Sequence, residues 1–300
     1  MINPFQSRFP DIANCDQYYY PILKQYGDDY GIGYPAGIPI VLATGNTVKI
    51  ARFKDYIEHF AAKHRFLYTL HILSNVSAPE IYYHYTENAK IKNDMAYYRL
   101  NEFECRPDPI MPIYCGGDYG DYIIITDDSG LEIPAFDNWP GVKTKRAAVN
   151  YNPVDGTKDP KDMSSAEVIL DNISRLDESE RYGFIYSACC VSLVNCSRKI
   201  IPEKRCVAIS KGSQPVLIGL PENFKERPMT AYDICSPCIY YGDKEDSPRF
   251  TRPTYSQMST AEMMLYGDYM YHAFDCAMEQ IMDSYIAALR NTYNYNERTD

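Results

Sequence analysis

The stretch IPIVLATGNTVKIARF, residues 38–53, predicts a buried strand, a sharp turn and the first turns of a helix. Residues 38–43 are a short apolar run bounded by Pro and Gly, which is typical of a strand that is buried on both faces. After the turn, apolar residues recur at helical spacing: Ile50, Phe53, Ile57 and Phe60. We therefore expect a helix over about residues 46–64.

The turn between these two elements carries more polar chemistry than a turn requires. Gly45 and Asn46 are ordinary turn residues, whereas Thr44 and Lys49 are explained better by a bound anion. The amide groups at a helix N-terminus attract phosphate, and a lysine adds a point charge. We expect Thr44, Asn46 and the first helical amides to form an anion cradle, with Lys49 facing a phosphate. The alternative is a plain turn followed by a solvated lysine.

A second stretch, DYIIITDDSG, repeats this pattern: its apolar run 122–126 is followed directly by Asp127, Asp128, Ser129 and Gly130. Ligands of open α/β sheets lie at the carboxyl ends of the strands, so two parallel strands would bring both polar clusters to one edge. Paired carboxylates suit a hard divalent ion, above all magnesium. Phosphate donors, a lysine and an acidic pair together indicate cleavage or transfer at a polyphosphate. Each cluster alone is also a common loop composition.

The rest of the chain alternates strand and helix patterns. Further strands are expected at 66–73, 183–194 and 205–210, with an apolar stretch at 215–220. Helices are expected from an N-cap at Thr86 to about Leu100, after Ser164 or Ser165, and over 259–291. Residues 1–37 read as an irregular extension, and the Pro- and Gly-rich residues 101–120 as a loop. This alternation predicts an α/β sheet with helices on its faces.

Charge and composition exclude several function classes. A formal net charge of -10 argues against a nucleic-acid or anionic-membrane surface, because such surfaces need clustered Lys and Arg. The chain shows neither an N-terminal signal segment nor an apolar run of membrane-spanning length, so we expect a cytoplasmic protein. The 29 tyrosines beside a single Trp leave a structural or assembly protein open as an alternative.

At this point the motifs resemble one family closely. The strand ending T-G-N-x-x-K, the later D-D-S-G-L and a P-G-V-x-T-x-R segment ending at Arg146 are similar to the inosine/xanthosine triphosphate pyrophosphatases, which hydrolyse non-standard purine nucleoside triphosphates. Thr144 replaces the usual Ser of that last segment. Between these motifs, PEIYYHYTENAKIKN resembles the family's E-x-x-x-[TS]-F-x-E-N-A-x-x-K segment, which contains Glu80, Asn88 and Lys92 here.

The resemblance implies a fold, a reaction and a set of roles. The fold would be a long mixed β-sheet with flanking helices forming two lobes around a central cleft, over residues 38–295 with an insertion at 101–120, usually as a homodimer. The reaction would be magnesium-dependent hydrolysis of a nucleoside triphosphate to a monophosphate and pyrophosphate. Lys49 and Lys92 would face the phosphates, Glu80 and Asp127 the metal, and Asp128 the metal or the attacking water. The implied substrate-binding set is Thr44, Gly45, Asn46, Lys49, Lys92, Ser129, Gly130, Arg146, Tyr232 and Asp233.

The C-terminal part departs from the family pattern. Where the family has G-F-G-Y-D-P, this chain keeps only Tyr232 and Asp233, and Ile234 replaces the Pro. The family's later Lys and Ser-His-Arg are missing, and Asp268 and Tyr269 stand where His and Arg would fall. A pocket that loses these donors cannot keep the same selectivity, so we hypothesise that the chain reads a different base or sugar. A nucleotide-binding pseudoenzyme on the same fold is the alternative.

Overall fold

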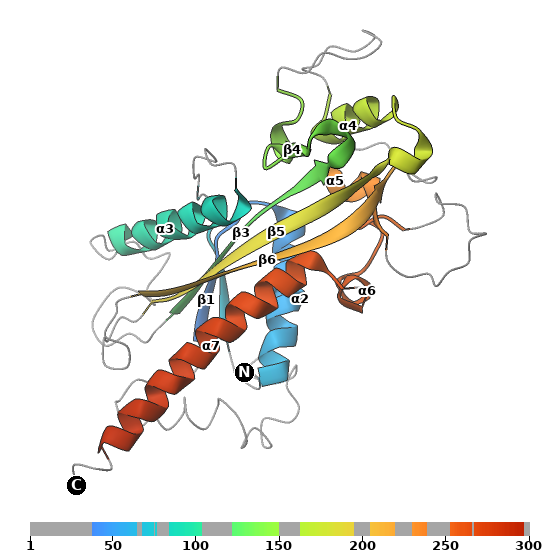
Figure 1. The fold of residues 1–300 in the computed structure, drawn as a ribbon. Coiled ribbons are helices and arrows are strands. Elements are labelled where there is room, and N and C mark those ends of the chain that lie inside the picture. Colours follow the sequence, from blue (N-terminus) through green and yellow to red (C-terminus); the bar gives the residue numbers. More distant parts are fainter. Residues whose placement is uncertain are drawn as a thin grey trace, which may run out of the picture.

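The computed structural model describes residues 38–64, 68–74, 76, 84–103, 122–149, 163–194, 205–219, 230–238, 253–265 and 267–296 (Figure 1). The predicted extension at 1–37 lies outside the described residues, and so does the part of the expected insertion that follows residue 103. None of the helices in the described ranges is long and apolar enough to cross a membrane.

The centre of the molecule is a seven-stranded sheet of mixed direction. Its order is β2 (Tyr68–Ile72), β1 (Ile38–Leu42), β3 (Tyr122–Ile133), β5 (Tyr182–Val194), β6 (Arg205–Ile218) and β7 (Cys235–Pro237), and β4 (Trp139–Gly141) pairs with β3. Strand β1 runs parallel to both β2 and β3, whereas the remaining pairs are antiparallel. The two motif-bearing strands, β1 and β3, therefore run parallel, which is the condition for their polar clusters to share one edge.

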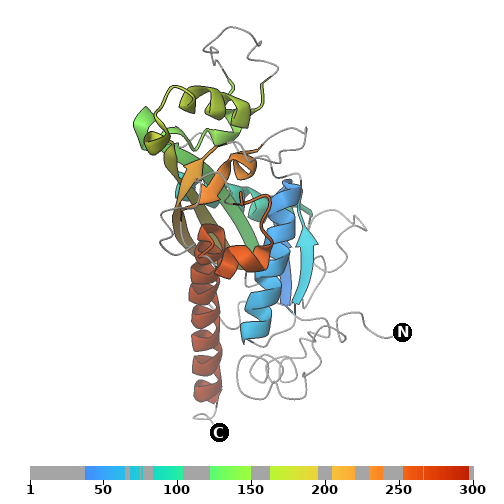
Figure 2. The same cartoon turned by 90° about the vertical axis from the view of Figure 1, so that its right-hand side faces the viewer.

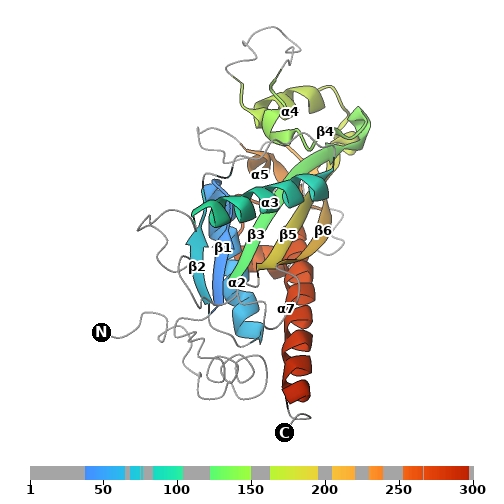
Figure 3. The ribbon, with the colours of Figure 1, turned by 90° about the vertical axis from the view of Figure 1, so that its left-hand side faces the viewer.

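Helices cover both faces of this sheet. Helices α2 (Thr47–His64) and α7 (Tyr269–Asn296) lie on one face, and α3 (Tyr85–Phe103) crosses the other (Figures 2 and 3). The shorter elements are α4 (Ser165–Ile173), α5 (Ala231–Ile234), α6 (Thr260–Leu265), η2 (Pro134–Phe136), η3 (Thr144–Arg146) and η5 (Glu178–Glu180). The predicted α/β class, a mixed sheet with flanking helices, is thus confirmed.

Strand β1 is buried on both faces, as its continuous apolar run predicts. Ile40 and Leu42 face the main core that α2 and α7 close, and Val41 belongs to a smaller core under α3. Phe53 of α2 packs edge-on against Phe274 of α7, with the ring centroids 5.9 Å apart. The helical spacing of apolar residues that follows the turn therefore supplies the contact between these two helices.

Four predicted elements differ from the structure. Helix α3 begins at Tyr85, so Thr86 is its second residue and not its N-cap. Strand β3 continues through the polar residues 127–130 to Ile133, because the long strand β5 offers backbone partners along its whole length. The expected strand 205–210 and the apolar stretch after it form one strand, β6. The expected helix 259–291 is interrupted before α7, where Gly267 has a φ of +85°. Asp268 then caps α7 by accepting a hydrogen bond from the amide of Met270 at 2.9 Å.

Helix α7 approaches β6 so closely that one glycine is required there. A Cβ atom at Gly212 would lie 1.8 Å from the carbonyl oxygen of Tyr269, the first residue of α7. We predict that Gly212→Ala displaces the start of α7 and lowers the free energy of unfolding by about 2 kcal/mol, measured by urea denaturation. Ser213→Ala, at the exposed next position of the strand, is the control and should change little. Equal stability of both variants would contradict this packing.

Candidate active site

The candidate site lies where one edge of β3 has no strand beside it. Strand β1 pairs with β3 as far as Ile125, and β4 pairs with it from Leu131 onward. Between these points, residues 126–130 have β5 on one side and no described strand on the other. The turn after β1 begins at this gap, since the amide of Ala43 donates to the carbonyl of Ile125 at 2.9 Å. The two polar motifs thus share one edge of the sheet.

Asp127 points to the α2 face and forms an ion pair with Lys49. The side chain of Asp127 is 1% exposed and that of Lys49 is 13% exposed, so the pair is largely shielded from water. Burial alone lowers the pKa of Lys49, but the negative charge of Asp127 and the hydrogen bond to it outweigh burial, so the pKa is raised above its ordinary value. Lys49 therefore carries its positive charge throughout the neutral range.

Asp128 points to the opposite face, where α3 supplies both of its partners. The ammonium of Lys92 donates to Oδ1 at 2.7 Å, and the amide of Asn88 donates to Oδ2 at 3.1 Å. Burial raises the pKa of Asp128, and the charge of Lys92 lowers it only in part, so this carboxyl titrates above its ordinary range. Both carboxylate oxygens of Asp128 are therefore held in place.

The two carboxylates form two separate lysine pairs, one on each face of the sheet. Successive residues of a strand point to opposite faces, and Asp127 and Asp128 obey this alternation because they lie inside β3. The sequence had suggested that both belong to a loop and hold one ion side by side. The two lysine–carboxylate pairs are nevertheless close together at this edge, because the ammonium of Lys92 lies 3.5 Å from the carbonyl oxygen of Asp127.

The turn after β1 satisfies much of its own hydrogen bonding. The side-chain oxygen of Asn46 accepts from the amides of Val48 at 3.0 Å and of Lys49 at 3.3 Å, which makes Asn46 the N-cap of α2. The amide of Asn46 in turn donates to Oγ1 of Thr44 at 3.2 Å. The predicted anion cradle is therefore partly occupied by the motif's own side chains. Its polar residues fix the start of the helix that carries Lys49.

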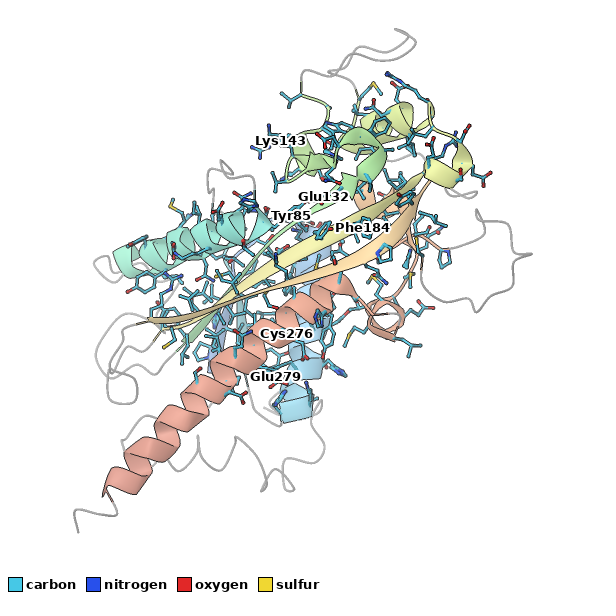
Figure 4. The ribbon with its side chains drawn as sticks, in the orientation of Figure 1. Tyr85, Glu132, Lys143, Phe184, Cys276 and Glu279 are labelled. Atoms are coloured by element: carbon cyan, nitrogen blue, oxygen red, sulfur yellow. The ribbon has the colours of Figure 1, made fainter. Side chains whose placement is uncertain are left out.

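Two motif glycines are required by close backbone contacts. A Cβ at Gly45 would lie 2.9 Å from the carbonyl oxygen of Ser74, which follows β2. A Cβ at Gly130 would lie 2.4 Å from the carbonyl oxygen of Gly141 and 2.8 Å from the ring of Tyr85. Figure 4 shows Tyr85 at the start of α3, close to Glu132 of β3. Gly130 thus lets the first turn of α3 lie against the strand that carries the carboxylates, and Ser129 beside it is partly exposed.

The segment after the D-D-S-G motif is hydrogen-bonded to the C-terminal part of β3. Oγ1 of Thr144 accepts from the amide of Leu131 at 2.8 Å and donates to the carbonyl of Gly141 at 2.6 Å. The threonine that replaces the usual Ser therefore ties η3 to the end of β3. Arg146 is exposed on the same η3 turn.

The remaining predicted site residues lie on another element, α5, or outside the described residues. Tyr232 and Asp233 are buried in α5, where Oδ2 of Asp233 accepts from the amide of Thr230 at 2.7 Å. Asp233 thus caps its own helix. Glu80 lies outside the described residues. Within the described part of the chain, no three His, Cys, Asp or Glu side chains gather as a metal-binding group.

One charged residue near the site was missed in the sequence. Arg52 of α2 is 4% exposed, and its guanidinium lies 4.3 Å from the ring centroid of Tyr232. Arg52 follows Lys49 by three residues, so the two side chains lie on neighbouring positions of one helix surface. A charged residue next to the apolar stripe of this helix, at Phe53 and Ile57, was the available signal.

The capping role of Asn46 can be separated from a phosphate-binding role. We predict that Asn46→Ala lowers the free energy of unfolding by about 1 kcal/mol, because two helical amides lose their acceptor. Asn46→Asp keeps the acceptor and should preserve stability, while its negative charge weakens the binding of tripolyphosphate. Urea denaturation and calorimetry measure the two effects. A full loss of stability in Asn46→Asp would contradict the capping role.

Comparison with known proteins identifies the family of this chain. The model of the Ham1 family matches residues 40–212. No curated protein sequence matches the chain. Among solved structures, a nucleoside-triphosphatase (dITP/XTP pyrophosphatase) from Mycobacterium abscessus is 19% identical with a TM-score of 0.42, covering 76% of this chain and 92% of that chain. A HAM1 protein from Coxiella burnetii is 18% identical with a TM-score of 0.47, covering 81% and 99%. The family match spans more than half of the sequence, and the chain therefore belongs to the Ham1 family.

Proposed function

We propose that this protein is a nucleoside triphosphate pyrophosphatase, which hydrolyses a nucleoside or deoxynucleoside triphosphate to the monophosphate and pyrophosphate. Family membership supports the general class of reaction. The observation that carries the proposal is the pair of lysine–carboxylate contacts, Lys49 with Asp127 and Lys92 with Asp128, at the unpaired edge of β3. Two cations and two carboxylates beside the carboxyl end of β1, the strand that runs parallel to β3, suit a triphosphate and a divalent ion.

The two lysines are the proposed phosphate ligands. Each ammonium has three N–H groups and donates to a carboxylate here, so each can also donate to a phosphate oxygen that enters the edge. Their places on α2 and α3 would hold the triphosphate from both faces of the sheet. The turn at Thr44, Gly45 and Asn46 lies beside Lys49 and would bound the same edge.

Asp127 is the proposed protein ligand for magnesium, together with Glu80 as the resemblance implies. The fit depends on its donor atoms: Oδ2 is bound to Lys49, whereas Oδ1 has no hydrogen-bond partner in the described part of the chain. Carboxylate oxygen is the donor that magnesium prefers, and the ion commonly completes its shell with phosphate and water. When bound, magnesium would neutralise developing charge on the phosphates.

Asp128 is the proposed acceptor of the proton from the attacking water. Lys92 and Asn88 orient its carboxylate, and its raised pKa makes it a better proton acceptor than an ordinary Asp. The water oxygen would form a bond to the α-phosphorus while the bond from that phosphorus to the bridging oxygen breaks. Pyrophosphate would leave, and the water proton would pass to Asp128.

Base selectivity is proposed to differ from that of the wider family. The positions where the resemblance places His and Arg hold Asp268 and Tyr269, and both of these side chains are buried. Asp268 is used to cap α7 and accepts from the hydroxyl of Tyr56. These contacts use both carboxylate oxygens of Asp268, which leaves the reading of the base to other side chains.

Isosteric substitutions test the catalytic assignment. We expect Asp127→Asn and Asp128→Asn to reduce magnesium-dependent pyrophosphate release by at least about 100-fold, because each removes a charge from the reacting edge. Release is measured over a panel of standard, deaminated and modified nucleoside triphosphates, with and without EDTA. Asp55→Asn, on the exposed side of α2, is the control and should keep full activity. Activity that survives in both site variants would sink the assignment.

The raised pKa of Asp128 predicts the pH profile. The carboxylate is the active form, so kcat/KM should fall as the pH drops through a value above the ordinary aspartate pKa of about 4. Asn88→Ala removes a hydrogen bond that stabilises the charged form, so the acid limb should move to still higher pH. An acid limb that Asn88→Ala leaves in place would argue against Asp128 as the titrating group.

A further inference from the structure

Helix α3 carries a buried asparagine in the middle of the face that packs on the sheet. Ala89, Asn93, Ala96 and Leu100 recur at helical spacing, and all four are buried. Asparagine is a weak helix former, and a polar side chain on a buried face is costly unless it is hydrogen-bonded. The presence of Asn93 on this face must therefore be explained by its contacts with the sheet.

All the hydrogen-bonding capacity of the Asn93 side chain is used. Its amide nitrogen donates to the carbonyl oxygens of Ile124 on β3 at 3.2 Å and of Cys190 on β5 at 3.0 Å. Its side-chain oxygen accepts from the hydroxyl of Ser192 at 2.7 Å and from Nη2 of Arg205. An asparagine side chain has two N–H groups and two acceptor lone pairs, so each has a partner here. Asn93 thus binds α3 to the strands β3, β5 and β6.

Two further contacts hold the same helix. Oγ1 of Thr126, a buried side chain of β3, donates to the carbonyl oxygen of Ala89 at 2.8 Å, one turn before Asn93. Arg205 of β6 also donates from Nη1 to Oδ1 of Asp94 at 2.6 Å. The residues that fix the helix in this way are called the α3 anchor: Asn93, Thr126, Ser192 and Arg205.

The anchor and the contacts of Asp128 lie on the same face of β3. Residues 124, 126 and 128 alternate toward α3, and the helix makes a polar contact with each of them. Lys92 directly precedes Asn93, and Asn88 lies one turn earlier. Asn88 has a short side chain that donates to Asp128 at 3.1 Å, so a slide of α3 by about 1 Å would break this bond. The register of α3 on β3 therefore decides whether its side chains reach Asp128.

Apolar packing alone does not fix that register. Ala89 and Ala96 let α3 lie close to the sheet, but their methyl groups are small and the hydrophobic effect is non-directional. Hydrogen bonds weaken when their length or angle changes, and a fully satisfied buried network specifies one arrangement. The bonds of Asn93 therefore fix a position of the helix that the alanines leave open.

We propose that Asn93 is a positioning residue, which sets the register of α3 so that Lys92 and Asn88 are held at Asp128. This inference rests on the proposed function, in which Lys92 binds a phosphate. Asn93 is fully buried and its side-chain bonds all go to the strands beneath α3. It therefore acts on the substrate only through its neighbours on the helix.

A double-mutant cycle on the binding of inorganic tripolyphosphate tests this role without turnover. Calorimetry in EDTA compares the unaltered protein, Asn93→Leu, Lys92→Met and the double variant. We expect each single variant to weaken binding about 10-fold, because each removes the fixed ammonium from the phosphate. The double variant should bind within about 2-fold of Lys92→Met alone, because Asn93 acts through that lysine.

Control variants separate positioning from stability. Leu100→Ala opens a cavity under the same helix, away from Asp128, so it should lower the urea midpoint and leave tripolyphosphate binding within about 2-fold. If Asn93→Leu fails to fold, Thr126→Val and Ser192→Ala each remove one contact of the α3 anchor. Each should weaken binding about 3-fold, and only in proteins that retain Lys92.

The outcomes distinguish this inference from the proposed function. Additive effects of Asn93→Leu and Lys92→Met would identify Asn93 as a stability residue and overturn the inference. Equal weakening of binding in Leu100→Ala and Asn93→Leu would overturn it as well. If Lys92→Met itself leaves tripolyphosphate binding unchanged, Lys92 is not a phosphate ligand, and the proposed function fails together with the inference that rests on it.

Discussion

The alternation of side chains along β3 is the constraint on which the rest of the site depends. Because Asp127 and Asp128 are consecutive residues of a strand, their carboxylates must point to opposite faces of the sheet. Each face then needs its own helix and its own lysine, and α2 and α3 supply Lys49 and Lys92. The position of β3 beside the end of β1 brings both pairs to one edge.

The lysine pairs define positions more than they add stability. Removing two charges from water costs several kcal/mol, and a buried ion pair recovers this only with good geometry and further hydrogen bonds. Asp128 has such support from Asn88, and its pKa is nevertheless raised. A site of this kind holds charged groups at fixed positions, where a phosphate and a metal ion can bind to them. The framework that carries it is stabilised by the two apolar cores on either side of the sheet.

An aromatic cluster surrounds Arg52, whose guanidinium lies over the rings of Tyr232 and Tyr255. Asp268 and Tyr269 begin α7, whose first residue lies directly on Gly212 of β6. That contact fixes the ring of Tyr269 beside Tyr255 and near the guanidinium from α2. Arg52 on α2 and Tyr269 on α7 are close enough for the charge of Arg52 to oppose the rise in the pKa of Tyr269, although they lie 217 positions apart in the sequence.

The sequence by itself determined the α/β class, the strand–turn–helix at 38–64 and the two polar motifs, because periodicity and turn chemistry are local properties. It also identified the family through motifs that lie close together in the chain. It could not tell that Asp127 to Gly130 lie inside a strand, since the pairing with β5 overrides their loop composition. Nor could it tell that Asn46 caps α2, or that Arg52 and Tyr269 share one cluster. Those facts depend on which distant segments pack together, and only the tertiary structure decides that.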